Sequence, residues 1–344
     1  MKYEIPLDRE RLIASIHHQY GLEVVRLDFI PQGEVGQHYR ATCADQRLFF
    51  LTLLGDNRLA RLGASRLDFY LILTSELYER GLFRQLAPPI RTLKGDLKIT
   101  FEGQPVILYR EIPGQNLMES LLLPPDLPQK TAELIANLHE VTSHLQLKIP
   151  YVEQFTLPFE QTLLEGLAAL EKIGKPNKPG RLALRDLLLP NQELIRNLLG
   201  SLRRLAEQAA GLQPDLVLCH TDANLANLIL EEGGELFLVD WEGAMLAPAE
   251  HDLFIFTGDG FPDFLHYYRQ VRPKVKLTAV LFAFYFYRRN LEDLTDWIVR
   301  ILYENTLAEQ DQHDLAGVQQ DCVAGWPHLE EEIQTIKELL AESA

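Results

Sequence analysis

The sequence predicts an α+β protein with two lobes, on three observations. Apolar runs separated by turn residues occupy residues 27–109, a pattern typical of an antiparallel sheet. Beyond Gly114 the apolar residues recur at helical spacing, as in residues 131–145 and 159–208. A short connector, YREIPGQN at 109–116, separates the two patterns. We therefore expect a small β-rich lobe at residues 1–112 and a large, mostly helical lobe at residues 113–344.

The small lobe is expected to be a meander interrupted by one helix. Residues 27–54 contain apolar runs separated by PQGEVG and ADQ, which we interpret as strands and turns. Residues 65–82 carry an apolar stripe at helical spacing, and Gly81 lies where a helix would end. KITFEGQPVILYR, at 98–110, is expected to form a hairpin that turns at EGQP.

The large lobe is expected to consist of helices around one isolated hairpin. The helices of residues 159–208 are broken by GKPNKPG, and the last third of the chain is also helical. The hairpin is NLIL-EEGG-ELFLVD, at 227–240, with Gly233 and Gly234 as a two-residue loop. In that register Asn227 lies opposite Asp240.

Composition and charge exclude several classes of protein. The chain has 344 residues, 47% of them hydrophobic, and 49 acidic against 33 basic residues give a net charge of -16. This charge repels nucleic acid and anionic membranes and suits a cationic ligand. The three cysteines are widely spaced, and the longest apolar stretch, residues 277–287, is shorter than a membrane span. We expect a soluble, cytoplasmic protein, monomeric by default, with no nucleic acid or membrane partner.

The polar residues around the hairpin indicate phosphoryl transfer. Directly opposed strand residues have Cβ atoms about 4.5–5.5 Å apart, so Asn227 and Asp240 could share one Mg²⁺. Asp222 lies five residues before Asn227, where its carboxylate could orient a substrate hydroxyl and take its proton. The alternative is that these residues only form turns and end strands.

Other catalytic motifs are absent from the sequence. It contains no GxxxxGK[ST] loop, no HExxH, no GxSxG and no GxGxxG. The pairs His17-His18 and His139/His144 have no carboxylate or cysteine companion at metal-ligand spacing. We interpret these histidines as surface or helix-packing residues.

The chain resembles the aminoglycoside phosphotransferase family of kinase-like small-molecule kinases. The resemblance rests on His220-x-Asp222, Asn227 and the hairpin that ends in VDW at 239–241. ANLHE at 136–140 adds to it. APAEHDLFIF at 247–256 and FYFYRRNLEDLTDW at 284–297 are similar to the spectinomycin phosphotransferase branch. The resemblance implies a protein-kinase-like fold, an ATP- or GTP-binding small lobe, and a catalytic and substrate-binding large lobe.

The resemblance also implies roles for individual residues. Asp222 is the expected catalytic base, and His220 is expected to hold the catalytic loop. Asn227 and Asp240 are the expected Mg²⁺ ligands. Asp252 matches a family aspartate expected to brace that loop, with a helix N-cap as the alternative.

On the nucleotide side, Gly33 and Gly36 match the loop that covers the phosphates. Thr52 stands where the family usually carries a strand lysine, which pairs with a helix glutamate. Glu76 is our candidate for that glutamate. Asn224 is a second departure, since many relatives have histidine there.

A substitute for the lysine could come from the segment after the strand. Glu76 or Glu79 would then pair with Arg58 or Arg61.

The expected function is Mg²⁺-dependent transfer of the γ-phosphoryl group of ATP or GTP to a hydroxyl of a small cationic molecule. An aminocyclitol or amino-sugar antibiotic is the first candidate, and choline or an amino alcohol remains open. Carboxylates that could bind the amine are Asp259, Asp263, Glu292, Asp293 and Asp296. Because Thr52 replaces lysine, a catalytically impaired nucleotide-binding relative is the main alternative, and an unrelated helical binding protein is a third.

Overall fold

A computed structural model describes residues 4–33, 35–120 and 123–342. The chain divides into two compact units, and each unit is built from three separate segments of the sequence. Unit 1 comprises Met1–Tyr151, Leu218–Leu246 and Asp263–Pro273, and unit 2 comprises Val152–Val217, Ala247–Pro262 and Lys274–Ala344. The predicted lobe boundary between residues 112 and 113 stays a prediction. No helix in the described residues is long and apolar enough to cross a membrane.

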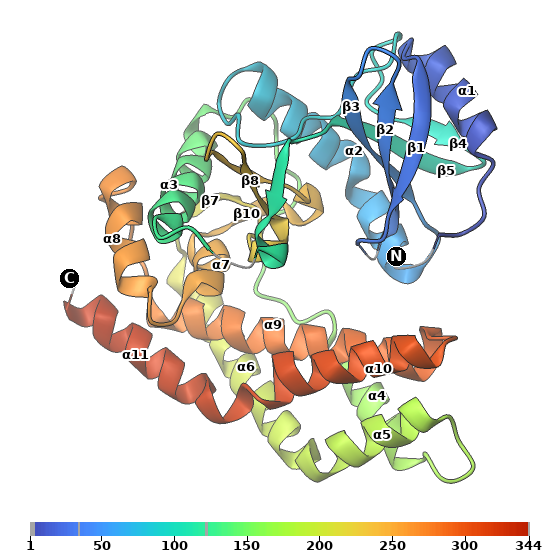
Figure 1. Ribbon diagram of the computed structural model, residues 1–344. Coiled ribbons are helices and arrows are strands. Elements are labelled where there is room, and N and C mark those ends of the chain that lie inside the picture. The colour runs from blue at the N-terminus through green and yellow to red at the C-terminus, as the bar shows by residue number, and fades with distance from the viewer. Residues whose placement is uncertain (1–3, 34, 121–122, 343–344) are drawn as a thin grey trace. The chain divides into compact units, whose positions relative to one another are not determined.

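Unit 1 begins with a five-stranded antiparallel sheet in the order β1-β2-β3-β5-β4 (Figure 1). The strands are β1 (Val24–Ile30), β2 (Gly36–Cys43), β3 (Leu48–Leu54), β4 (Ile99–Phe101) and β5 (Gln104–Arg110). The β4–β5 hairpin turns at Glu102 and Gly103, which both have positive φ, as its EGQP motif predicts. β3 is the central strand and pairs with a neighbouring strand on each side, β2 and β5.

Two helices accompany this sheet. Helix α1 (Arg9–Tyr20), which the sequence patterns do not reveal, shares an apolar core with one face of the sheet, including Leu12, Ile16, Tyr39 and Leu51. Helix α2 (Arg58–Glu79) begins seven residues before the predicted helix, because Asn57 caps it by accepting from Ala60 N. The residue that follows its C-cap is Gly81, at φ 67°, so the predicted end is confirmed.

The predicted hairpin is part of a second, three-stranded sheet in unit 1. Strands β8 (Leu228–Glu231) and β9 (Leu236–Leu238) form the hairpin, and β6 (Gly114–Asn116) adds to β8. The expectation of an isolated hairpin is therefore wrong. The connector supplies the third strand, since Gln115 pairs with Leu230. Helices α3 (Leu127–Glu140) and most of α8 (Phe261–Val271) complete unit 1.

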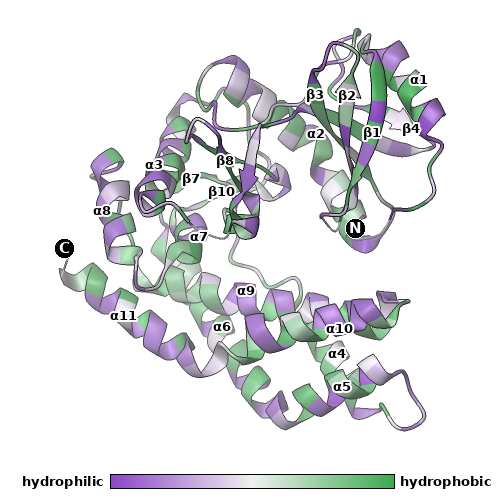
Figure 2. Cartoon of the chain, viewed as in Figure 1, coloured by the Kyte–Doolittle hydropathy of each residue, from purple (hydrophilic) through white to green (hydrophobic). Residues whose placement is uncertain are grey.

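Unit 2 is helical. Its main helices are α4 (Glu160–Glu171), α5 (Pro179–Leu188), α6 (Gln192–Leu212), α7 (Glu250–Leu253), α9 (Ala279–Val299), α10 (Ala308–Gly317) and α11 (Leu329–Glu342). The sequence GKPNKPG separates α4 from α5, as predicted. Helices α4, α6 and α11 pack against α9, whose first turns bury Phe282 and Phe284 (Figure 1). Figure 2 shows apolar and polar residues in separate patches along α6 and α11, as the packing requires. Strands β7 (Leu216–Cys219) and β10 (Met245–Pro248) both run from one unit into the other.

Candidate active site

The predicted catalytic loop is the tight segment of unit 1 between β7 and β8. Thr221 has a φ of 77°, so the chain reverses directly after β7. Asn224 then caps the short 3-10 helix η4 (Leu225–Asn227), because its Oδ1 accepts from Ala226 N at 2.8 Å. These two local constraints fix the backbone that carries Asp222 and Asn227.

Both carboxylate oxygens of Asp222 accept a side-chain amide. Asn224 Nδ2 donates to Oδ1 at 2.9 Å, and Asn227 Nδ2 donates to Oδ2 at 3.0 Å. Asn227 Nδ2 also donates to the Asp222 carbonyl at 2.8 Å. The carboxylate is thereby fixed in orientation while it keeps its capacity to accept a proton. Asn224, where the resemblance leads us to expect histidine, thus orients the Asp222 carboxylate and caps η4.

His220 joins the catalytic loop to the segment that follows β9. Its ring is fully buried, and its Nε2 lies 2.9 Å from the Val239 carbonyl. The Asp222 amide donates to its Nδ1 at 3.4 Å, so the tautomer is the one with hydrogen on Nε2. The ring also packs edge-on against Trp241 at 5.1 Å. These contacts support the scaffold role predicted for His220.

The register of the hairpin differs from the predicted one by one residue. Leu228 pairs with Leu238 and Leu230 with Leu236. The reason is a three-residue loop, in which Glu231 N donates to Glu235 O and Gly234 alone adopts positive φ, at 85°. Asn227 therefore lies opposite Val239, whose amide donates to its carbonyl at 3.0 Å. The predicted cross-strand pair of Asn227 and Asp240 is wrong.

Asp240 nevertheless belongs to the same polar cluster as Asp222. It has left-handed backbone angles, φ 71° and ψ 66°, two residues after the end of β9. Glu242 follows two residues later, and the two carboxyl groups interact. Burial and then the charges of Asp240 and Asp222 raise the pKa of Glu242 to about 9, against the opposing charge of Arg66.

These residues fit a divalent cation. Asn227 uses its amide nitrogen on Asp222, which leaves Oδ1 as the acceptor that it can offer to a metal ion. Oxygen donors are those that Mg²⁺ prefers. The charges of Asp240 and Asp222, which raise the pKa of Glu242, are charges that a bound cation would offset. Our prediction omitted Glu242, although the second acidic residue of VDWEG was a visible signal.

The two predicted phosphate-loop glycines lie at close backbone approaches in unit 1. Gly33 has a φ of 73°, and a Cβ there would overlap the Nε2 atom of His38. A Cβ on Gly36 would overlap the carbonyl of Leu53 in β3. Both positions therefore require glycine for a structural reason. Their predicted contact with nucleotide phosphates stays a prediction.

Thr52 is buried in the central strand and bonds to a histidine. The register places it opposite His38 of β2, and its hydroxyl lies 3.1 Å from His38 Nδ1. The His38 ring stacks on Phe50 at 5.2 Å. Burial lowers the pKa of His38 to about 4, so the imidazole is neutral at neutral pH. A neutral pair thus occupies the strand position where the family resemblance predicts a lysine.

The predicted substitutes for the lysine–glutamate pair do not form. Glu76, Arg58 and Arg61 all lie on α2, and 15 to 18 residues of helix separate the glutamate from the arginines. At a rise of 1.5 Å per residue that separation is more than about 20 Å, which excludes a pair. Glu76 instead bonds to Arg80 at 2.5 Å and accepts from the Gln146 amide at 3.0 Å.

Glu79, the other predicted partner, pairs with Arg91 at 3.0 Å and lies farther still from both arginines. The role of Glu76 in nucleotide binding stays a prediction.

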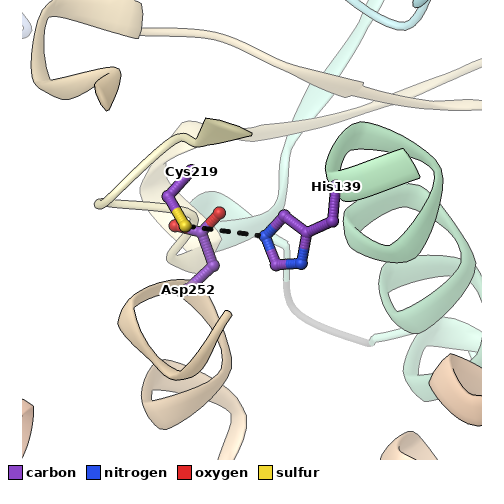
Figure 3. A group of neighbouring side chains, drawn as sticks. All are labelled: His139, Cys219 and Asp252. Carbon is purple, nitrogen blue, oxygen red and sulfur yellow. Dashed lines mark hydrogen bonds between the residues drawn. The ribbon is translucent and has the colours of Figure 1, made fainter. Parts of the chain in front are cut away.

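His139, interpreted above as a packing residue, has a cysteine neighbour in space. Figure 3 shows His139 of α3 and Cys219 at the end of β7, with His139 Nε2 3.9 Å from Cys219 Sγ. The other ring nitrogen lies 2.7 Å from the hydroxyl of Tyr268. Both residues are buried, and these contacts agree with the packing role.

The carboxylates predicted to bind an amine lie in different settings. In unit 2, Glu292 pairs with Arg288 at 3.4 Å and Asp293 with Arg289 at 2.7 Å, each four residues along α9. Asp259 and Asp263 are exposed. Asp252 is fully buried inside α7, whose N-cap is Ala249, so the N-cap interpretation of Asp252 is wrong.

Comparison with known families decides the class of this site. Residues 39–273, which include every residue of the catalytic loop and of the β8–β9 hairpin, match the model of the phosphotransferase enzyme family (APH). The chain belongs to this phosphotransferase family. The predicted family resemblance is therefore confirmed, and the chain is an enzyme of the phosphotransferase class.

Solved structures confirm the kinase-like fold of this phosphotransferase. Spectinomycin phosphotransferase in complex with ADP and spectinomycin is similar with a TM-score of 0.74 and 19% identity, over 95% of this chain and 100% of that one. The choline kinase of Streptococcus pneumoniae has a TM-score of 0.56 and 17% identity, over 95% and 99%. A microcompartment-associated aminopropanol kinase has a TM-score of 0.63 and 14% identity, over 94% and 98%.

Proposed function

We propose that this phosphotransferase moves the γ-phosphoryl group of ATP or GTP to a hydroxyl of a small cationic molecule, with Mg²⁺ as cofactor. The observation that carries the proposal is the setting of Asp222, whose two carboxylate oxygens are each held by an asparagine amide. A carboxylate fixed in this way is suited to a hydroxyl nucleophile, because it can accept the proton without first reorganising.

In the proposed reaction the acceptor oxygen forms a bond to the γ-phosphorus as the bond to the leaving nucleoside diphosphate breaks. Asp222 takes the hydroxyl proton. Asn224 and Asn227 keep the carboxylate aimed, and His220 keeps the loop joined to the segment after β9 through Val239. Mg²⁺, held by Asn227 and Asp240, would neutralise charge on the phosphates.

The proposed acceptor is an aminocyclitol or an amino sugar, with choline or an amino alcohol as the next choice. The excess of 49 acidic over 33 basic residues supports a cationic ligand. The similar proteins whose structures are solved act on spectinomycin, choline and aminopropanol, as their names state, and the first was crystallised with ADP. Nucleotide use by this chain is proposed on the same ground.

The second candidate is a relative that binds nucleotide and transfers slowly or not at all. The hydrogen-bonded pair of Thr52 and His38 favours it, because two neutral side chains cannot neutralise phosphate charge as a lysine would.

Single-turnover transfer of labelled γ-phosphate separates these candidates. The protein would be mixed with labelled ATP or GTP, Mg²⁺ and a panel of aminocyclitols, amino sugars, choline and amino alcohols. Transfer to an amine-bearing acceptor supports the first candidate. Binding of nucleotide in a thermal-shift assay without any transfer supports the second, and neither binding nor transfer would overturn both.

A further inference from the structure

Arg66, on the third turn of α2, bonds to the segment that carries the proposed metal ligand. Its Nη2 donates to the carbonyl of Gly243 at 3.2 Å and to that of Ala244 at 2.6 Å. These carbonyls end the 3-10 helix η5 (Trp241–Gly243), which begins directly after Asp240. Arg66 and all residues of this segment belong to unit 1.

The guanidinium of Arg66 is held rigidly. It lies over the ring of Tyr151, with Cζ 4.0 Å from the ring centroid, and Phe69 packs edge-on against the same ring at 5.1 Å. Its Nε is buried and has no acceptor among the described residues. Burial lowers the pKa of Arg66, but a guanidinium remains charged at neutral pH.

The positive charge of Arg66 lies beside the acidic cluster. A Cβ on Gly63, one turn before Arg66, would lie 4.0 Å from Glu242 Oε2, so this carboxyl group faces the same part of α2. Arg66 therefore bonds to the backbone of a segment whose Glu242 side chain lies beside the same helix.

The opposite side of the segment is fixed by the catalytic loop. A Cβ on Gly243 would overlap Thr221 Oγ1 and would approach the His220 carbonyl to 3.1 Å. The backbone at Gly243 thus lies between the loop on one side and Arg66 on the other.

We propose that Arg66 is a positioning residue for metal binding: it fixes the segment from Asp240 to Ala244 through hydrogen bonds to two carbonyls. This inference rests on the proposed Mg²⁺-dependent function. It assigns to α2 a direct link to the segment that carries the proposed metal ligand. Position 52 of this chain is threonine, so α2 cannot form an ion pair with a lysine there. Residues that orient metal ligands from outside typically change metal affinity about 10–100-fold when removed.

Three variants test the proposal. Arg66→Met keeps a stem of similar length but removes the charge and both donors, whereas Arg66→Lys keeps the charge and loses the planar fork. Arg91→Met is the control, because Arg91 pairs with Glu79 at the other end of α2. The first measurement is the Mg²⁺ concentration that gives half-maximal transfer at saturating nucleotide. The second is hydrogen exchange of the amides of Ala244 and Leu246 in protein without metal.

For Arg66→Met we expect the half-saturating Mg²⁺ concentration to rise about tenfold or more, with a change of less than about threefold in the KM for nucleotide at saturating Mg²⁺. The half-saturating Mg²⁺ concentration of Arg66→Lys should lie between those of Arg66→Met and the parent. That of Arg91→Met should match the parent. Exchange at Ala244 and Leu246 should accelerate in Arg66→Met, with unchanged protection in β1–β5.

A parent-like Mg²⁺ requirement in Arg66→Met would overturn the proposal, and so would faster exchange spread evenly over the whole unit. If Arg66→Met does not fold, Arg66→Lys decides by the same two measurements. If the parent neither transfers phosphate nor binds nucleotide, the proposed function fails. The Arg66 proposal is then decided separately, by exchange at Ala244 and Leu246 and by Mn²⁺ binding measured with paramagnetic resonance.

Discussion

Two buried carboxylates of unit 2 and the carboxyl groups of the candidate site in unit 1 have opposite electrostatic settings. In unit 2 the buried Asp314 receives a bidentate guanidinium from Arg300, at 2.9 Å and 2.8 Å, and an amide from Asn305. Glu153 receives Arg288 at 2.7 Å. In unit 1 the carboxyl groups after β7 and β9 gather at one place, and their repulsion contributes to the raised pKa of Glu242.

This difference separates groups that hold the fold from groups prepared for chemistry. A buried carboxylate paired with arginine is neutralised within the protein, and removal of its partner leaves a costly isolated charge. We propose that the group of carboxyl groups in unit 1 is instead completed by a cation from outside. The following predictions test that distinction, in order of decreasing effect.

Asp222→Asn should reduce phosphoryl transfer by about 10²-fold or more, because it removes the proton acceptor and keeps the shape. Nucleotide binding should survive. Single-turnover transfer and thermal shift measure the two effects, with Asp45→Asn, an exposed carboxylate in the β2–β3 turn, as the matched control. Transfer at the parent rate would remove Asp222 from the mechanism.

Arg300→Met should lower the free energy of unfolding by about 3–5 kcal/mol, because it leaves the buried carboxylate of Asp314 without its cation. Denaturant unfolding measures this loss. Arg26→Ala, which removes an exposed pair with Asp28, should cost about 1 kcal/mol or less. Equal losses in the two variants would contradict the structural role given to Asp314.

Glu250→Gln should change how stability depends on pH. Burial raises the pKa of Glu250 from 4.5 to about 7, so the folded protein keeps the proton after the unfolded chain has lost it. The contribution of Glu250 to stability is therefore fully present below about pH 4.5 and is lost as the pH rises through about 7, by roughly 3 kcal/mol. Glutamine keeps the bond from the Thr278 amide, seen at 2.8 Å, and should abolish this fall.

Unfolding at a series of pH values measures this effect, with the exposed Glu338→Gln as control. An unchanged pH profile in Glu250→Gln would show that Glu250 titrates normally in the folded protein.

Asp240→Ala should abolish the Mg²⁺ dependence of nucleotide binding, because Asn227 alone is a neutral, monodentate ligand. In the parent, nucleotide with Mg²⁺ at about 100 times its Kd should stabilise the fold by about 2.7 kcal/mol. Thermal shift with and without Mg²⁺ gives the comparison, and Asp215→Ala, an exposed residue just before β7, serves as control. Equal Mg²⁺ stabilisation of Asp240→Ala and the parent would exclude Asp240 as a ligand.

Thr52→Lys should change turnover by less than about tenfold if the chain is an active kinase, because Mg²⁺ and an arginine then neutralise the phosphate charge. If the chain is an impaired relative, the variant should instead gain slow nucleotide hydrolysis or transfer that the parent lacks. Thr52→Lys also removes the hydrogen bond between Thr52 and His38. His38→Gln, which alters the same pair without adding a charge, is the control for that loss.

The sequence by itself determined the family, the kinase-like fold and the segments that carry the candidate site. Strand, turn and helix signals are local: Gly81 ends α2, and EGQP turns the β4–β5 hairpin, because the required backbone angles suit those residues. The spacing of His220, Asp222, Asn227 and Asp240 is likewise written in the chain, so the family could be identified before the structure.

The tertiary structure decided which side chains meet. Gly233-Gly234 permits either a two- or a three-residue loop, and only packing of β8 against β6 and β9 selects the register. Arg66 is 177 residues from Gly243, and no local pattern predicts that their groups bond. The pairing of Thr52 with His38 could not be predicted from the sequence either, and the same holds for the raised pKa of Glu242. Both depend on distances in space, which sequence spacing does not fix.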